Sequence, residues 1–172
     1  AQLAAAQQQR VVVPDLLEIL LETLAFTARD SEYIDEKSGV SARLSISAYE
    51  NLVSTAERRA IINQEEKTLA RITDFWGIVP AITGKVELVY EGEQEGPYGV
   101  AMALLSTALK KRFLDHFPDP DKLEKGEKSD PYGTIRAWFS AGNVAELLND
   151  SSDQTYQKNL DNVAGLRKLV EK

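Results

Sequence analysis

The most unusual placement of a charged side chain is that of Arg43, which ends the string Ser38-Gly39-Val40-Ser41-Ala42-Arg43. Ser41 is of the type preferred at helix N-caps, so Arg43 falls in the first turn of a predicted helix. That end of a helix carries partial positive charge, which disfavours an arginine unless an anion balances it. Two interpretations stay open: Arg43 holds an anion, or it pairs with Asp35 or Glu36.

Two other groups of side chains have the right types for chemistry but the wrong arrangement. Carboxylates around the GEQEG turn have the oxygens that hard cations prefer, but their spacing fits no calcium loop and favours a solvated acidic turn: Glu87, Glu91, Glu93 and Glu95. His116 follows Asp115, and neighbours on a helix point apart, so we do not expect an acid–base pair.

Missing residue types exclude most catalytic sites. The chain has no cysteine and one histidine, which excludes thiolate sites, histidine clusters and cysteine nucleophiles. It has no GxxxxGK[ST] loop and no hydrophobic strand that ends in paired acids, so it cannot assemble a nucleotide-hydrolysing site alone. We therefore expect no catalytic residue, no metal site and no cofactor within this chain.

Composition indicates an ordinary globular chain with few charge-driven partners. Of the 172 residues, 43% are hydrophobic and 27% charged, enough for a substantial core. A net charge of -7 argues against binding to nucleic acid or anionic lipid, because both require Lys and Arg to neutralise phosphate. No apolar run is long enough to cross a bilayer and no signal peptide is visible. The absence of cysteine agrees with a cytoplasmic location.

The spacing of apolar residues predicts a mainly α fold. A helix apolar on more than one face is expected over 15–30, followed by a polar loop over 29–39 and a second helix from Ser41 to about Asn63. A short helix should follow Thr73 as N-cap, with Asp74 in its first turn, and Pro80 should end or kink it.

The second half of the chain is expected to continue in helices. KVELVY, in 83–96, alternates like a strand but has no evident partner, so we expect an irregular or helical segment there. Helices are predicted over 99–117, over 134–141 and from Ser152, with a Pro- and charge-rich linker over 118–131. Residues 1–10, AQLAAAQQQR, are interpreted as a leader cut from a longer polypeptide; a processed N-terminus is the alternative.

VVVPDLLEILLETLAFTAR followed by SGVSARLSI resembles the start of the helical lid in magnesium-chelatase-like and MoxR-like AAA+ ATPases. RITDFWGIVPAI is similar to the last lid helix of that family. The resemblance implies a lid over 11–81, in which Arg43 is the sensor-2 arginine that reaches the γ-phosphate of ATP. It implies that Ser38, Gly39 and Ser41 form the supporting loop. ATP and Mg²⁺ would belong to a parent protein whose Walker motifs lie upstream.

The remaining residues resemble the tail of a bacterial subgroup related to magnesium chelatase, and differ from the chlorophyll-pathway enzymes, whose lid ends sooner. An accessory segment and long helix over 82–117 and a helical tail over 132–172 would complete the chain. The implied function is a non-catalytic lid and accessory region that senses ATP state. Its partners would be the upstream AAA+ core, neighbouring subunits and a protein substrate.

A free-standing helical adaptor is the alternative function. It would bind another protein through the apolar faces of Leu16–Phe26 and Val100–Phe117. In the lid interpretation, 11–13 and the outer face of Leu16–Leu24 would instead meet the core domain. Either interpretation predicts exposed apolar side chains on the first long helix.

Overall fold

The computed structural model describes residues 3–38, 40–123 and 130–171. The fold is mainly α, as predicted, with 62% helix and 4% strand. The chain divides into two compact units, Ala1–Asp115 and His116–Lys172. The finer division into lid, accessory segment, linker and tail stays a prediction, and residues 124–129 of the expected linker lie outside the described ranges.

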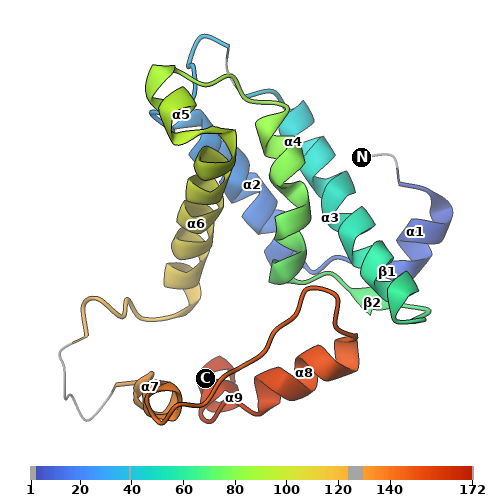
Figure 1. Ribbon diagram of the computed structural model, residues 1–172, viewed down its shortest axis with the longest axis vertical. Coiled ribbons are helices and arrows are strands. Elements are labelled where there is room, and N and C mark those ends of the chain that lie inside the picture. Colours follow the sequence, from blue (N-terminus) through green and yellow to red (C-terminus); the bar gives the residue numbers. More distant parts are fainter. Residues whose placement is uncertain (1–2, 39, 124–129, 172) are drawn as a thin grey trace. The chain divides into compact units, whose positions relative to one another are not determined.

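Helices dominate the first unit, with one small parallel sheet (Figure 1). In chain order its elements are α1 (Ala5–Arg10), β1 (Val11–Val12), α2 (Asp15–Arg29), α3 (Arg43–Ile62), β2 (Thr68–Leu69), the 3₁₀ helix η1 (Ile72–Ile78), α4 (Val79–Thr83), α5 (Tyr90–Glu95) and α6 (Pro97–His116).

Helix α2 confirms the prediction over 15–30. Pro14 precedes it, and Asp15 and Glu18 place negative charge in its first turn, where the helix dipole favours it. Its core stripe comprises Leu17, Leu20, Leu21, Leu24 and Ala28. A second apolar stripe of Leu16, Ile19 and Phe26 is exposed, so within the described structure α2 is covered on one side only.

Helix α3 packs against α2, η1 and α4 and confirms the predicted second helix. It begins at Arg43, and its N-cap is Ala42 instead of the predicted Ser41, because Ala42 already has a near-helical backbone. The Ser41 hydroxyl, one position earlier, still accepts a hydrogen bond of 3.2 Å from the Arg43 amide at the start of the helix. The side chains that α3 buries are Leu44, Ala48, Leu52, Val53, Ala56, Arg59 and Ala60.

The sheet was not predicted. β1 and β2 run parallel with Val11 opposite Thr68 and Val12 opposite Leu69. Of the valines expected to meet a core domain, Val11 is buried and Val12 is 54% exposed, so the patch is partly exposed. The residues interpreted as a leader include helix α1, whose Gln7 donates a 2.8 Å hydrogen bond to Glu57 on α3.

The 3₁₀ helix η1 corrects the predicted N-cap at Thr73. The carboxylate of Asp74 accepts a 2.8 Å hydrogen bond from the Arg71 amide, so the helix starts at Ile72 and Thr73 lies inside it. Asp74 is in the first turn, as expected. The helix η1 ends at Ile78, just before Pro80, as expected. Pro80 itself lies in the first turn of the next helix, α4, where its missing N–H costs nothing.

The segment over 83–96 is partly helical, as expected, and its extended part finds a partner in the loop after α2. Leu88 forms an isolated antiparallel bridge with Ile34, with Asp35 N donating to Glu87 O at 2.9 Å. In α5, Gly92 passes close to this loop, because a Cβ there would lie 2.4 Å from the Tyr33 carbonyl oxygen.

Helix α6 confirms the predicted long helix and turns its apolar face into the core, where Val100, Ala101, Leu104, Leu105 and Ala108 are buried. This corrects one part of the adaptor hypothesis, because that face of Val100–Phe117 is already occupied. Its exposed large apolar side chains are Tyr98, Phe113 and Leu114.

The second unit contains α7 (Gly133–Ser140), α8 (Asp153–Asp161) and α9 (Leu166–Val170). The Ser152 hydroxyl caps α8 by accepting from the Thr155 amide at 3.2 Å. The expected single terminal helix is two helices, since Gly165 adopts a left-handed φ of 86° between them. Tyr132 and Val163 are the buried apolar side chains among the described residues of this unit.

Candidate functional site

The loop between α2 and α3 is fixed by a hydroxyl between two carboxylates. Ser38 Oγ lies 2.8 Å from Asp35 Oδ2 and 2.5 Å from Glu87 Oε2. A hydroxyl has one proton, so it donates to one of the two at a time. The hydrogen bond from Ser38, followed by that from the Lys37 amide, lowers the pKa of Asp35. These contacts join the loop to the segment before α5.

Arg43 combines a fixed backbone with an exposed side chain. Its amide donates to Ser41 Oγ, and the next amide, of the fully buried Leu44, donates to Ser41 O at 2.8 Å. The guanidinium is exposed, and it forms no ion pair with Asp35 or Glu36, both of which the structure describes. The pairing interpretation of Arg43 is therefore not realised.

The predicted site consisted of Arg43 with Ser38, Gly39 and Ser41. Of these residues, the structure brings together Ser41 and Arg43. Ser38 is turned to Asp35 and Glu87. Gly39 lies outside the described residues. What remains is an exposed guanidinium at the positive end of a 20-residue helix, which can bind anionic oxygen by charge-assisted hydrogen bonds. It offers no proton acceptor for acid–base chemistry.

Sequence reasoning missed a buried ion pair on the same helix. Arg59 is 1% exposed and contacts Asp74 through Nε at 3.3 Å and Nη2 at 2.9 Å. Its guanidinium also donates to Thr68 Oγ1 at 2.8 Å and to the Leu69 carbonyl at 2.9 Å. Arg59 thus joins α3 to β2 and to η1. Its role is structural, since it is removed from solvent.

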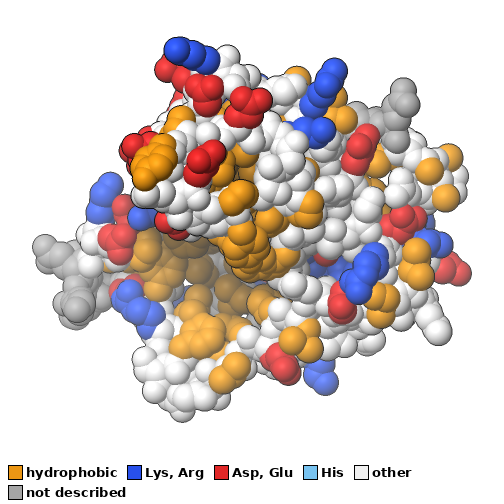
Figure 2. All heavy atoms as spheres, turned by 45° about the horizontal axis from the view of Figure 1, so that its top comes forward, with side chains coloured by type: hydrophobic (Ala, Val, Ile, Leu, Met, Phe, Trp, Pro, Cys, Tyr) orange, Lys and Arg blue, Asp and Glu red, His pale blue; other side chains and the backbone are white. Residues whose placement is uncertain are grey.

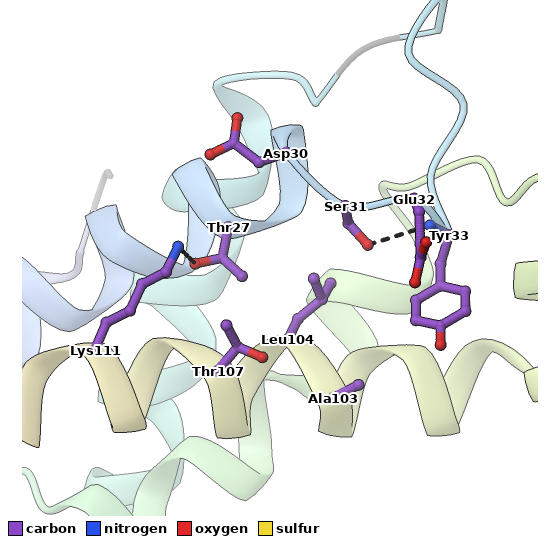
Figure 3. Close-up of a pocket in the computed structure, with 9 residues that line it drawn as sticks. All are labelled: Thr27, Asp30, Ser31, Glu32, Tyr33, Ala103, Leu104, Thr107 and Lys111. Carbon is purple, nitrogen blue, oxygen red and sulfur yellow. Dashed lines mark hydrogen bonds between the residues drawn. The ribbon is translucent and has the colours of Figure 1, made fainter. Parts of the chain in front are cut away.

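A groove lies between the end of α2 and α6 in the first unit (Figure 3). It encloses about 310 Å³. Glu32 and Tyr33 point from the loop toward α6, and Lys111 reaches back to the Thr27 hydroxyl at 3.4 Å. We call it the α2–α6 groove; its lining residues are Thr27, Asp30, Ser31, Glu32, Tyr33, Ala103, Leu104, Thr107 and Lys111. The small residues Ala103 and Thr107, one helical turn apart, are the feature of the sequence that could have indicated this groove.

Exposed apolar side chains gather around the start of α2. Val12 and Leu69 are register partners in the sheet and are 54% and 50% exposed. Leu16 and Ile19, three positions apart in the first turns of α2, are 41% and 43% exposed. We call these four residues the outer apolar face. Such a surface is typical of an interface.

Across the ranges that the structure describes, no three His, Cys, Asp or Glu side chains are grouped as a metal site requires. The described helices include none with the length and apolar character to cross a membrane. Comparison of the chain with protein-family models, with curated proteins and with solved structures finds no significant match.

Proposed function

We propose that this chain is the lid and accessory region of an AAA+ ATPase related to the magnesium chelatases and MoxR-like proteins, and that Arg43 senses ATP bound to a separate core domain. The observation that carries the proposal is the state of Arg43. Its amide is held by the Ser41 hydroxyl at the start of α3, while its guanidinium is exposed and paired with neither Asp35 nor Glu36. Such a side chain is positioned to meet an anion from outside the chain.

The chemistry is an electrostatic bias on the position of the lid. ATP and Mg²⁺ would be held by the core of the parent protein. The Arg43 guanidinium would donate to the γ-phosphate oxygens and favour the closed lid. Hydrolysis removes that contact, so the lid would then be released toward the open state. In this proposal the chain binds and positions, and the core performs the reaction.

The outer apolar face supports the same proposal. A lid needs a surface that contacts the core, and Val12, Leu16, Ile19 and Leu69 are exposed where the chain enters α2. The loop that carries Arg43 is joined to residue 87 through Ser38, so movement at the site would reach the accessory segment before α5.

Steady-state ATPase measurements on the parent protein test the proposal. A charge-assisted contact is worth about 1.5–3 kcal/mol, so Arg43→Ala should lower turnover roughly tenfold to a hundredfold. The matched control is Arg58→Ala, because Arg58 is exposed on the same helix two turns or more from the site. Arg59 is unsuitable as a control because it is buried. Full activity of Arg43→Ala would contradict the sensor role.

A helical adaptor is the second candidate, and the outer apolar face is the observation that favours it. An adaptor would bind its partner through Leu16 and Ile19 without nucleotide. Binding that is lost in Ile19→Gln and unchanged in Arg43→Ala, with or without ATP, would favour the adaptor. Loss in both variants only when ATP is present would favour the lid.

A further inference from the structure

We propose that the α2–α6 groove binds a second copy of this chain, with the two α6 helices antiparallel about a two-fold axis. The inference is independent of the ATPase proposal, because it uses the opposite end of α2 and a different helix. It rests on three observations: the exposed face of α6, the groove beside it and the distribution of charge along both.

The exposed face of α6 is shaped for close approach. Ala103, Ser106, Thr107 and Lys110 are all exposed, and their spacing of three, four and seven places them on one side of the helix. Three of the four side chains are small. The face opposite to them is buried in the core, so the helix is held rigidly in position. A second helix can therefore approach α6 closely along this line.

The charged side chains beside the groove select the helix that can bind there and its direction. An antiparallel copy centred between Ser106 and Thr107 sets its Lys110 opposite Ala103 of the first copy. Ala103 lies in the groove with Glu32 and Tyr33, whose side chains point toward α6 (Figure 3). The second copy's Lys110 therefore meets Glu32, and the two-fold axis repeats this pair on the other side. A parallel copy would set like charges side by side.

Charge is also distributed unevenly between the two ends of α6, with acidic residues before its start and basic residues near its end. The acids of α5 precede the helix, and Glu91, Glu93 and Glu95 are exposed. Figure 2 shows acidic side chains gathered toward the top of the view. The last turns of α6 contain Lys110, Lys111 and Arg112, and although Asp115 pairs with Arg112 at 3.0 Å, this end keeps a net positive charge. Antiparallel pairing brings the basic end of each copy toward the acidic end of the other.

The pair should be weak. A helix of 20 residues is about 30 Å long, and one helix face buries much less than a stable dimer interface. We therefore expect a monomer–dimer equilibrium that depends on protein concentration. Added salt should weaken it, because the charges that select the partner are exposed.

Sedimentation of the whole chain over a wide concentration range tests the proposal. Glu32→Lys and Lys110→Glu should each weaken the dimer about tenfold or more, since each replaces two attractive pairs by repulsive ones. The double variant restores both pairs and should dimerise like the original chain. An equimolar mixture of the two single variants should form heterodimers, although neither forms homodimers.

Lys67→Glu, a charge reversal at an exposed residue outside the groove, is the matched control and should leave the dimer unchanged. Ile19→Gln tests separately whether the outer apolar face forms the contact. Thermal unfolding of each variant excludes loss of folding as the cause. A chain that stays monomeric at every concentration would overturn the proposal and leave the groove to another protein. A dimer that tolerates both charge reversals, or that Ile19→Gln abolishes, would also overturn it and move the interface to α2.

Discussion

At the scale of single residues, Arg59 shows how the first unit tolerates a buried charge. Its guanidinium has donors to Asp74, to Thr68 and to the Leu69 carbonyl, and Asp74 also accepts from the Arg71 amide. Both charged groups therefore exchange water for several hydrogen bonds. Removing one partner strands the other in the core, which is far more costly than the net worth of the pair.

We predict that Arg59→Ala destabilises the chain by about 3–5 kcal/mol, the usual cost of leaving a buried charge unpaired. Urea unfolding measures this as a lower midpoint. Arg59→Met combined with Asp74→Leu removes both charges and should cost less than either single change. The matched control is the exposed Arg58→Ala, expected within about 0.5 kcal/mol of the original chain. Similar stability of Arg59→Ala and the control would contradict the structure.

The loop before Arg43 contains a carboxyl group, that of Asp35, whose pKa depends on the folded structure. The Ser38 hydroxyl lowers the pKa of Asp35 below its usual 3.8, because it donates to the ionised carboxylate. A lowered folded-state pKa means that this contact stabilises the loop above pH 3.8 and is lost as pH falls through the folded pKa.

Ser38→Ala should raise the pKa of Asp35 toward 3.8, but not fully, since the Lys37 amide still donates to its other oxygen. Carboxyl chemical shifts followed by NMR against pH give the value directly. An Asp35 pKa that does not respond to the substitution would show that Ser38 faces Glu87 alone.

At the scale of elements, α3 and η1 approach each other closely at Gly77. A Cβ on Gly77 would lie 1.9 Å from Thr55 Oγ1 and 2.9 Å from Thr55 Cβ, so no larger residue fits without a shift. Thr55 is held by its own hydrogen bond of 2.7 Å to the Asn51 carbonyl, which leaves little room for it to move. Gly77 therefore allows η1 to pack against α3.

Gly77→Ala should destabilise the chain by about 1–3 kcal/mol through overpacking. Combining it with Thr55→Ala removes the Oγ1 contact and should recover part of the loss, which a double-mutant cycle of unfolding free energies would show as coupling. Gly133→Ala is the control, since its Cβ would meet no atom closer than 3.4 Å. Additive effects of the Gly77 and Thr55 changes would mean that the helices do not meet there.

The elements also show what the sequence can and cannot predict. Helices α2, α3 and α6 follow from apolar spacing that is visible within each segment. The β1–β2 pair does not, because its strands have two residues each and their partners are distant in the sequence. The start of η1 depends on one hydrogen bond from Arg71 to Asp74, which spacing does not reveal. Long-range pairing decides these cases.

In the candidate site, too, the sequence reveals local relations between residues but not contacts between distant positions. Arg43 and Ser41 were predicted together because their relation is local, within one helical turn. The burial of Arg59 depends on Asp74, fifteen positions away, and on β2, so the spacing within its own helix does not reveal it. The contact of Ser38 with Glu87 spans 49 positions and was equally invisible. The α2–α6 groove needs two helices and a loop to be placed before it exists.

At the scale of the whole chain, the two units differ in how much they bury. The first has a continuous core drawn from α2, α3, η1, α4 and α6. In the second, the helices α7, α8 and α9 contain no buried residue in their described parts, and Tyr132 and Val163 lie just outside them. Small units with so little core are marginally stable. We therefore expect the second unit to unfold at lower urea concentration than the first.

Limited proteolysis tests this division. Residues 118–131 are rich in proline and charge and contain few large apolar groups, and the Lys122 side chain is 83% exposed. Trypsin needs an extended, accessible segment, so the first cut should fall at Lys122, Lys125 or Lys128. Mass spectrometry should show a fragment from the first residue to that point, resistant to further cleavage because its core is intact. That fragment should keep one cooperative unfolding transition, while the released C-terminal piece should be degraded quickly. Early cleavage after Arg58 or Arg59, in the middle of the core, would contradict a first unit that is stable alone.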